Sequence, residues 1–312
     1  INLFNLIFTS FIVIISCSDV ELIEKEKEAD NLINTFIKEN KIPGLSVTIL
    51  NGDGYIEYSK GFGYADLEKK ININPKNSIF RIGSFSKTLA GTALMKMYEE
   101  KKIEIDSPVG YYIKNLPADK KKITLKQIAG HLSGIRHYGD GDDMNLNLNY
   151  ENTSEALNIF INDSLLFDPG TKYSYSTHAW TLLSLAMEKA YGENFIELMK
   201  NEILNPLQLN KTFAEEIDLV LNDKVTFYEK NESGNIVLCP DVNNSWKWAG
   251  GGYVSTTQDM AKFTWKVLYT DFLLPETVKE MTKSQKLPDN KKTNYGIGWR
   301  IRYDDENNPY LG

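Results

Sequence analysis

Basic charge, histidine and cysteine are all scarce in this sequence. The formal net charge is −7, so the chain lacks the basic face that nucleic-acid binding needs. Its three histidines and two cysteines form no cluster with the spacing of metal ligands. Gly250-Gly251-Gly252 is not followed by the Lys-Ser/Thr pair of a phosphate-binding loop. The sequence therefore predicts no metal, no cofactor and no nucleic-acid partner.

The sequence also lacks a run of about twenty apolar residues at its start, the length that a membrane-spanning helix needs. Residues 3–15 form a shorter apolar run that fits the core of a signal peptide. Ile14-Ile15-Ser16-Cys17 follows and resembles a bacterial lipobox, in which the cysteine is lipidated. We therefore expect secretion to the bacterial cell envelope and a membrane lipid anchor at Cys17; an ordinary signal peptide is the alternative. Because the chain begins with isoleucine and no basic segment precedes the run, we expect its start to be clipped.

The first part of the chain has the patterns of a helix and a hairpin. Apolar residues recur at helical spacing between residues 29 and 37, which predicts a helix with one apolar face. Residues 45–49 alternate between apolar and polar, as a half-buried strand does. Asn51-Gly52-Asp53-Gly54 is a hairpin signal, and residues 55–62 are predicted to form the returning strand.

The hydrophobic period becomes helical after Ser84. Ala90, Ala93, Leu94 and Met97 predict a helix with a buried stripe, and further helical segments continue to residue 248. Residues 179–190 are apolar nearly all round, so we expect them to be buried. Residues 258–284 are predicted to be helical again and residues 295–303 to form a strand. This order of elements predicts a sheet domain into which a helical region is inserted.

Ser84-Phe85-Ser86-Lys87 is an S-x-x-K element. Chance alone predicts about two such matches in a chain of this composition, so its placement at the start of an amphipathic helix carries more weight. Residues three apart share a helical face, and a helix N-terminus favours an oxyanion and disfavours a charged lysine. Lys87 can then take the proton from the Ser84 hydroxyl. The alternative is that Ser84 is only an N-cap and Lys87 a solvated residue.

A second element follows the turn Asp168-Pro169-Gly170. Tyr173-Ser174-Tyr175-Ser176-Thr177 precedes the buried helix and is similar to F/Y-x-Y-S-N, the second motif of class C β-lactamases and D-Ala-D-Ala carboxypeptidases. From about residue 28 to its end the chain resembles the serine β-lactamase and penicillin-binding protein superfamily. The branch it resembles most contains the mitochondrial serine β-lactamase-like proteins and their bacterial relatives. The stretches that carry the resemblance are FRIGSFSK at 80–87, HLSGIRHY at 131–138, YST at 175–177 and WKWAGGGYVST at 246–256.

This resemblance implies a fold and a mechanism. The fold is of the α/β (α+β) class, β-lactamase/transpeptidase-like, with an antiparallel sheet flanked by helices and a large inserted helical region. Ser84 matches the acylated nucleophile and its backbone N–H matches one oxyanion donor. Lys87 matches the activating lysine, and Tyr175 matches the tyrosine that shares proton transfer. How Lys87 and Tyr175 divide the general-base task stays open, because their titrations are coupled.

The sequence departs from the superfamily pattern at two places. Thr177 stands where most members have an asparagine that contacts the substrate amide; the mitochondrial-type branch also has threonine there. Thr177 is therefore a candidate substrate-binding residue, and its identity favours a peptidase or esterase role. Tyr295-Gly296-Ile297-Gly298-Trp299 is present, but the third motif, K-T-G or H-x-G, is due just after Gly312. We expect the chain to be truncated there, and these 312 residues alone to fold poorly and to have little activity.

The resemblance also suggests a domain division. We expect a lipoprotein signal peptide at residues 1–17 and a sheet subdomain, incomplete at its C-terminus, formed by residues 18–80 and 250–312. Residues 81–249 are expected to form the inserted, mainly helical subdomain.

Three function classes stay open. The leading one is a serine hydrolase that forms an acyl-enzyme on amide, ester or lactam bonds, such as an envelope peptidase or carboxypeptidase. Its substrate would be a small peptide, an ester or a β-lactam. The second is a penicillin-binding sensor that deacylates very slowly, and the third is a non-catalytic protein that self-assembles into an oligomer.

The remaining reactive side chains are weaker candidates. His131 and His137 flank Ser133-Gly134, and we expect this segment to be a structural turn below the site. His178 either lines the site or packs at a helix start. Cys239 is expected to be a buried or free thiol.

Overall fold

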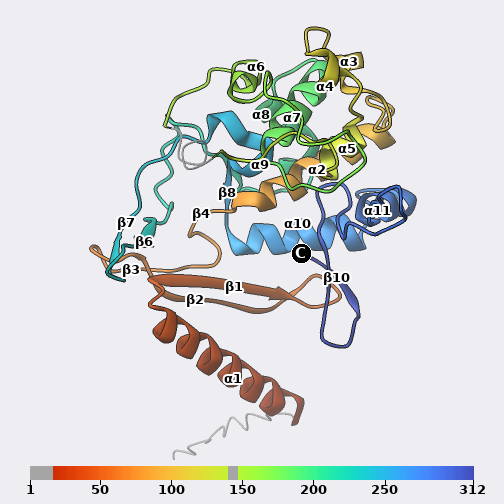
Figure 1. Cartoon of the computed structure of the whole chain (residues 1–312). Helices are drawn as coiled ribbons and strands as arrows, with labels where there is room; N and C mark the ends of the chain where they lie inside the picture. Colours follow the sequence, from red (N-terminus) through yellow and green to blue (C-terminus); the bar gives the residue numbers. More distant parts are fainter. Residues whose placement is uncertain (1–16, 140–146) are drawn as a thin grey trace, which may run out of the picture.

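The structure, a computed structural model, describes residues 17–139 and 147–312, and Figure 1 shows how its elements are arranged. The helices are α1 (Cys17–Asn40), α2 (Ser86–Glu99), α3 (Val109–Tyr112), α4 (Ala118–Lys121), α5 (Leu125–Ala129), α6 (Thr153–Ala156), α7 (His178–Tyr191), α8 (Phe195–Met199), α9 (Trp248–Gly251), α10 (Thr257–Tyr269) and α11 (Pro275–Thr282). The strands are β1 (Gly44–Leu50), β2 (Ile56–Asp66), β3 (Ile71–Asn72), β4 (Phe80–Arg81), β5 (Phe213–Ala214), β6 (Tyr228–Lys230), β7 (Ile236–Leu238), β8 (Tyr253–Ser255), β9 (Ile301–Tyr303) and β10 (Pro309–Leu311).

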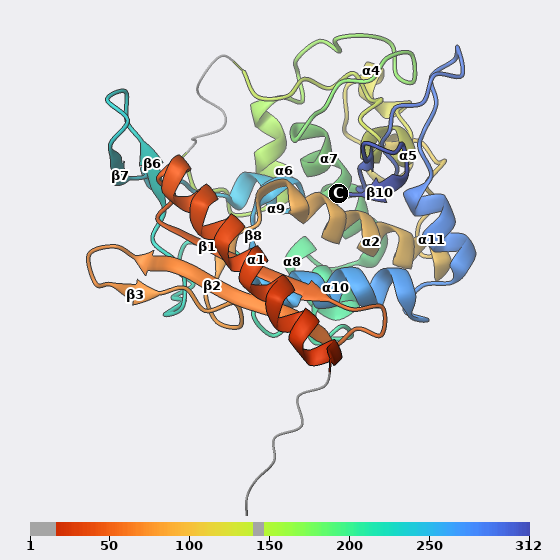
Figure 2. The same cartoon turned by 90° about the horizontal axis from the view of Figure 1, so that it is seen from below.

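The predicted hairpin forms one antiparallel sheet in the order β1-β2-β3. Helix α1 covers one face of this sheet and α10 covers the other (Figures 1 and 2). On the α1 side, the phenol of Tyr58 donates a hydrogen bond to Asp30 over 2.6 Å. On the α10 side, the hydroxyl of Thr257 lies 2.8 Å from that of Ser46. The predicted combination of an antiparallel sheet with flanking helices is therefore confirmed.

The helical part of the molecule is built around α2. Its residues from Ser86 to Met95 are all buried, and α2 packs against α7, α9 and α11. The predicted buried segment is α7, whose residues from His178 to Met187 are buried. Gly192 ends α7 in the left-handed region at φ +92, the usual way for glycine to terminate a helix. One large hydrophobic core therefore surrounds the helix that begins just after Ser84.

Two predictions near the C-terminal part of the chain are wrong in detail. The segment 258–284 is not one helix but two, because Pro275 occupies the first turn of α11 and the residue before a proline avoids the helical region. The predicted strand 295–303 is a strand only at Ile301–Tyr303. Before it, Tyr295 bridges to Arg300 across a tight turn in which Gly298 has φ +76.

Some predictions on chain organisation stay untested. The lipobox residues 14–16 and the apolar run before them lie outside the described residues, as does the side chain of Cys17. Within residues 17–139 and 147–312, no helix is both long enough and apolar enough to span a bilayer. The boundaries between the sheet subdomain and the inserted subdomain stay a prediction.

Candidate active site

Ser84 lies in a short 3-10 turn, Gly83–Phe85, between β4 and α2. Strand β4 is fixed by antiparallel pairing with β8, and the N–H of Ile82 donates to the carbonyl oxygen of Tyr253 over 3.1 Å. Gly83 has φ +51, a conformation that glycine adopts without strain. The chain therefore turns sharply after a fixed strand, and the Ser84 residue stays exposed while α2 behind it is buried.

Lys87 lies one turn further along and is completely buried. Its Nζ atom is 3.3 Å from Oγ of Ser84 and 3.0 Å from Oγ1 of Thr177, and it also donates to the carbonyl oxygen of Gly250. Burial, and after it the positive charges of Lys247 and Arg300, hold the pKa of Lys87 well below its ordinary value of 10.5. A buried amine in such surroundings favours the neutral form, which can accept a proton.

Tyr175 reaches the same serine from the other side. Its phenol donates a hydrogen bond to Oγ of Ser84 over 2.8 Å, and its ring centroid lies 4.8 Å from Nζ of Lys87. Burial raises the pKa of Tyr175 above 10.0, against the opposing effects of the Ser84 hydrogen bond and the Arg300 charge. The three predicted catalytic residues thus meet at the Ser84 hydroxyl, with a lowered amine pKa on one side and a raised phenol pKa on the other.

Thr177 is buried rather than open to the solvent, with 1% of its surface exposed. Its hydroxyl lies against Nζ of Lys87, and its methyl group is next to Gly250, where an added Cβ would come within 2.5 Å of it. The structure therefore gives Thr177 a contact with the lysine of the site. Its predicted contact with substrate stays a prediction.

An ion-pair network centred on the buried Glu215 contacts the strand before Ser84. Arg81 of β4 donates from Nε to both carboxylate oxygens of Glu215, over 2.9 and 2.8 Å. Glu215 also pairs with Lys224 at 2.6 Å and accepts a hydrogen bond from the side chain of Asn244. The Glu215 side chain is buried, whereas those of Arg81 and Lys224 are partly exposed. The network ties β4 to the segment that leads to Gly250.

A cavity of about 400 Å³ opens in front of Ser84. It is lined by Ser84, Phe85, Thr88, Tyr175, Tyr295, Gly298, Arg300, Arg302 and Gly312. Arg300 also lies over the Tyr175 ring, with its Cζ atom 5.8 Å from the centroid. The cavity therefore presents positive charge close to the nucleophile.

Sequence reasoning missed Arg300 and Arg302. The chain has only four arginines, and these two flank Ile301 at the start of β9. Residues two apart in a strand point to the same face, so the Arg-Ile-Arg pattern directly after Tyr295-Gly296-Ile297-Gly298-Trp299 was a usable signal. The pattern does not indicate which cavity the two arginine side chains would line.

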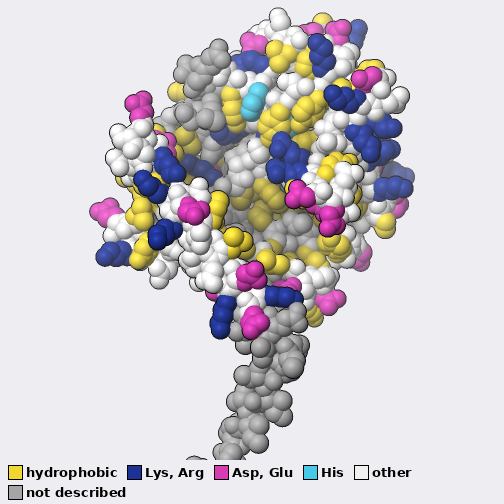
Figure 3. Space-filling view, turned by 60° about the horizontal axis from the view of Figure 1, so that its bottom comes forward, with side chains coloured by type: hydrophobic (Ala, Val, Ile, Leu, Met, Phe, Trp, Pro, Cys, Tyr) yellow, Lys and Arg dark blue, Asp and Glu magenta, His cyan; other side chains and the backbone are white. Residues whose placement is uncertain are grey.

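A larger cavity, of about 680 Å³, lies between β1 and α10 and shares only Phe85 with the lining of the Ser84 cavity. Its other lining residues include Val47, Trp265 and Tyr269 but none of the three predicted catalytic residues. Figure 3 shows the molecule hollowed on one face, with hydrophobic side chains inside the hollow and Lys and Arg side chains beside it. The three predicted catalytic residues therefore belong to the smaller cavity, of which Ser84 and Tyr175 are lining residues.

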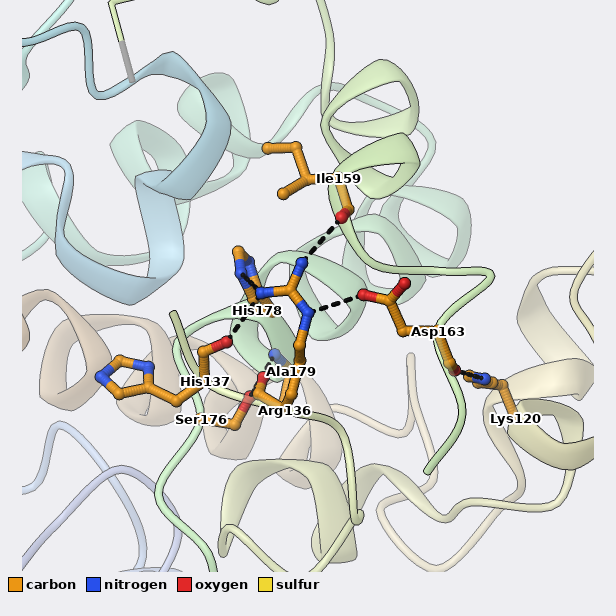
Figure 4. A network of polar contacts seen from close by, with 8 residues as sticks. All are labelled: Lys120, Arg136, His137, Ile159, Asp163, Ser176, His178 and Ala179. Atoms are coloured by element: carbon orange, nitrogen blue, oxygen red, sulfur yellow. Dashed lines mark hydrogen bonds and ion pairs between the residues drawn. The ribbon is translucent and has the colours of Figure 1, made fainter. Parts of the chain in front are cut away.

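His178 does not line the Ser84 cavity. It is fully buried, its ring stacks on Phe160 with 4.7 Å between centroids, and its Nε2 atom lies 3.1 Å from Nη1 of Arg136. Figure 4 shows Arg136 at the centre of this network, with its guanidinium also bonded to Asp163 and to two backbone carbonyls. The packing alternative for His178 is therefore the one that the structure shows.

The described part of the chain contains no group of three or more His, Cys, Asp or Glu side chains placed to hold a metal ion. The chemistry available at Ser84 is acyl transfer by a hydroxyl nucleophile. It needs a nearby base and a proton donor, and both roles can be filled by Lys87 and Tyr175.

Comparison with known proteins gives a family match over most of the chain. A family model described as Beta-lactamase matches residues 29–310. The human protein described as "Serine beta-lactamase-like protein LACTB, mitochondrial" is 28% identical over 357 residues, which cover 87% of this chain and 65% of that protein. The chain thus spans less than two thirds of the length of this relative.

Solved structures give the same fold. An octameric penicillin-binding protein homologue from Pyrococcus abyssi superposes with a TM-score of 0.77 at 25% identity, over 91% of this chain and 67% of that one. EstCE1, described as a hydrolase with promiscuous acyltransferase activity, superposes with a TM-score of 0.79 at 20% identity, over 94% of this chain and 86% of its own. At this identity, the similarity to EstCE1 shows only that the two chains share a fold.

Proposed function

The chain belongs to the Beta-lactamase family, and from that premise we propose that it is a serine hydrolase in which Ser84 forms an acyl-enzyme. One observation carries the proposal: Oγ of Ser84 lies within hydrogen-bond distance of both Lys87 Nζ, at 3.3 Å, and Tyr175 OH, at 2.8 Å. A serine hydroxyl is a weak nucleophile until a base removes its proton. A packing serine would not need both groups directed at its oxygen.

We infer the two roles from the directions in which the pKa values of Lys87 and Tyr175 are shifted. Lys87 has its pKa lowered by burial, so its neutral amine is the better base. Tyr175 has its pKa raised by burial, so its phenol stays protonated and has a proton to pass on. Ser84 Oγ bonds to the acyl carbon as its proton passes to Lys87. The bond from the acyl carbon to the leaving nitrogen or oxygen then breaks as Tyr175 protonates that atom, and Lys87 returns a proton to Tyr175. Water then cleaves the acyl–Oγ bond and restores the serine.

The substrate we propose carries a negative charge near the scissile bond. Arg300 and Arg302 line the cavity beside Ser84, and a guanidinium pairs well with a carboxylate. A peptide with a free C-terminal carboxylate fits this arrangement, which supports a peptidase or carboxypeptidase acting on envelope peptides. Esters and β-lactams offer the same acyl carbon and remain to be compared.

The test is hydrolysis by the full-length protein of four acyl compounds: a peptide ending in D-Ala-D-Ala, the same peptide with an amidated C-terminus, a p-nitrophenyl ester and a β-lactam. We expect the free-acid peptide to be cleaved faster than its amide, and all turnover to disappear in Ser84→Ala. Turnover that survives in Ser84→Ala contradicts the proposal. Stoichiometric labelling of Ser84 without turnover would instead indicate the penicillin-binding sensor.

We also propose that the protein is a lipoprotein of the bacterial cell envelope. The support is the sequence alone: an apolar run followed by Ile14-Ile15-Ser16-Cys17. Metabolic labelling with a fatty acid is expected to mark the full-length protein and not its Cys17→Ala variant. Equal labelling of both would overturn the anchor. Self-assembly into an oligomer stays a prediction, to be tested by light scattering.

A further inference from the structure

Two histidines hold the turn that carries Tyr175 and Thr177. The backbone N–H of Ser176 donates to Nδ1 of His131 over 3.1 Å, and the next N–H, that of Thr177, donates to Nδ1 of His137 over 3.2 Å. Consecutive backbone amides are thus both bound to imidazoles of one segment, residues 131–137. A backbone N–H can donate only to an unprotonated nitrogen, so each of these rings must have its Nδ1 free of a proton.

The two imidazoles differ in their surroundings. His131 is fully buried, and its ring packs against that of Tyr175 with 4.2 Å between centroids. Burial holds its pKa well below 6.5, so it stays neutral. His137 is only partly buried. Its imidazole is therefore less shielded from solvent than that of His131.

Positive charge and aromatic rings surround His137. Its ring stacks on Tyr138 with 4.0 Å between centroids and meets the Tyr175 ring edge-on at 5.4 Å. Figure 4 shows this ring pointing away from the Arg136 guanidinium, which binds only the backbone oxygen of His137. Among residues 17–139 and 147–312, the charged and titratable groups around His137 are Lys87, Lys247, Arg136, His131, Tyr138 and Tyr175.

We propose that His137 is a positioning residue of the site: its neutral imidazole accepts the N–H of Thr177 and thereby holds Thr177 against Lys87 and Tyr175 against Ser84. Protonation of His137 would replace the acceptor with a second donor and push the 175–177 turn away. It would also add a positive charge beside Lys87. The inference rests on the proposed hydrolase function, since only then does the displaced turn cost activity.

The sign of the pH effect follows from the environment. Burial, and then the charges of Lys87 and Lys247, lower the pKa of His137 from 6.5. Above the lowered pKa the Thr177 bond is present, and as the pH falls through it the bond is lost. His137 therefore acts as a positioning residue that fails only at acidic pH. Burial holds the pKa of the fully buried His131 well below 6.5.

Two substitutions distinguish the role of His137 as a hydrogen-bond acceptor from the packing of its ring. In His137→Asn the side-chain oxygen sits on Cγ, as Nδ1 does, and can accept the Thr177 N–H but cannot titrate. In His137→Phe the ring remains but the acceptor is gone. We expect His137→Phe to lower kcat about three- to tenfold at neutral pH, the loss of roughly one hydrogen bond. His137→Asn is expected to retain kcat and to lose activity less steeply with falling pH than the wild type.

The decisive readout does not need turnover. The chain has only three histidines, so nitrogen NMR can assign each tautomer, and His137→Asn identifies its signals. We expect Nδ1 of His137 to be the unprotonated nitrogen at neutral pH, and the Thr177 amide resonance to titrate with His137 in the wild type but not in His137→Asn. A protonated Nδ1, or a Thr177 amide that ignores the His137 titration, overturns the inference. If the NMR result holds while Ser84→Ala keeps its activity, the hydrolase proposal fails and the positioning contact stands.

Discussion

The Nζ atom of Lys87 lies 3.0 Å from Oγ1 of Thr177, a residue 90 positions later in the chain. This contact joins the S-x-x-K helix to the turn that carries Tyr175, and both side chains in it are buried. Thr177 therefore contacts the lysine of the candidate site in the absence of substrate.

Substitutions of Thr177 test whether its hydroxyl contact with Lys87 matters for turnover. Thr177→Val keeps the shape of the side chain but removes the hydroxyl next to Lys87, whereas Thr177→Ser keeps the hydroxyl. We expect kcat of the valine variant to fall about three- to tenfold, as for the loss of one buried hydrogen bond. The serine variant should stay within about twofold. Steady-state kinetics on an ester substrate measures both, and equal losses would mean that packing by the methyl group matters more than the hydroxyl.

Tyr175→Phe removes only the phenolic oxygen that donates to Ser84 over 2.8 Å. The ring and its packing on His131 are retained, so the fold should be unaffected. We expect kcat to fall about 10²- to 10⁴-fold, the usual contribution of one proton-transfer group. Tyr111→Phe is the matched control, since Tyr111 is 68% exposed and lies in α3, outside the Ser84 cavity. A Tyr175→Phe enzyme that keeps wild-type kcat would remove the phenol from the mechanism.

The lowered pKa of Lys87 predicts a dependence of stability on pH. Between its lowered folded pKa and 10.5, the unfolded chain binds a proton that the folded protein does not. The free energy of unfolding therefore rises with pH through this window. Lys87→Met should abolish turnover and flatten that rise, so the wild type gains stability relative to the variant as the pH increases.

Chemical denaturation at several pH values from about 6 to 9 measures this difference. Lys200→Met is the control, because the Lys200 side chain is 54% exposed and its removal should leave the slope unchanged. A wild-type slope identical to that of Lys87→Met would show that Lys87 keeps its proton in the folded protein.

Gly298 is predicted to be essential for the position of Lys87. It has φ +76, and an added Cβ would lie 2.4 Å from the backbone oxygen of Lys87. Gly192 also has a positive φ, +92, but an added Cβ there meets nothing within 4 Å. Gly192→Ala should cost only the conformational strain, roughly 1–2 kcal/mol. Gly298→Ala should cost more, and the surviving folded protein should also lose kcat. Thermal unfolding and steady-state kinetics measure both variants. Equal losses of stability and of kcat in the two variants would contradict the close approach of Gly298 to the backbone of Lys87.

Sequence patterns were sufficient for some of this structure. Period-two alternation with the turn at residues 51–54 located the β1–β2 hairpin. Helical period located α2, and a segment that is apolar nearly all round located α7. Ser84 and Lys87 came from the S-x-x-K element and Tyr175 from the family resemblance, and the structure brings these three side chains together. Their catalytic roles stay predictions.

The rest could not be predicted for physical reasons. Arg300 and Arg302 are candidate site residues because they line the Ser84 cavity. A cavity is formed by residues far apart in the chain, so a local pattern cannot reveal it. The acceptor role of His137 depends on a backbone amide 40 positions away, and no local pattern encodes that distance. The break at residues 270–274 was foreseeable from Pro275, but helical periodicity on both sides concealed it.

The measurement that tests the central claim most directly is the mass of the full-length protein after reaction with an acylating ester or a β-lactam. The account predicts one covalent adduct, located on the peptide that contains Ser84, absent from Ser84→Ala and strongly slowed in Lys87→Met. An adduct on another residue, or the same adduct in Ser84→Ala, would contradict it.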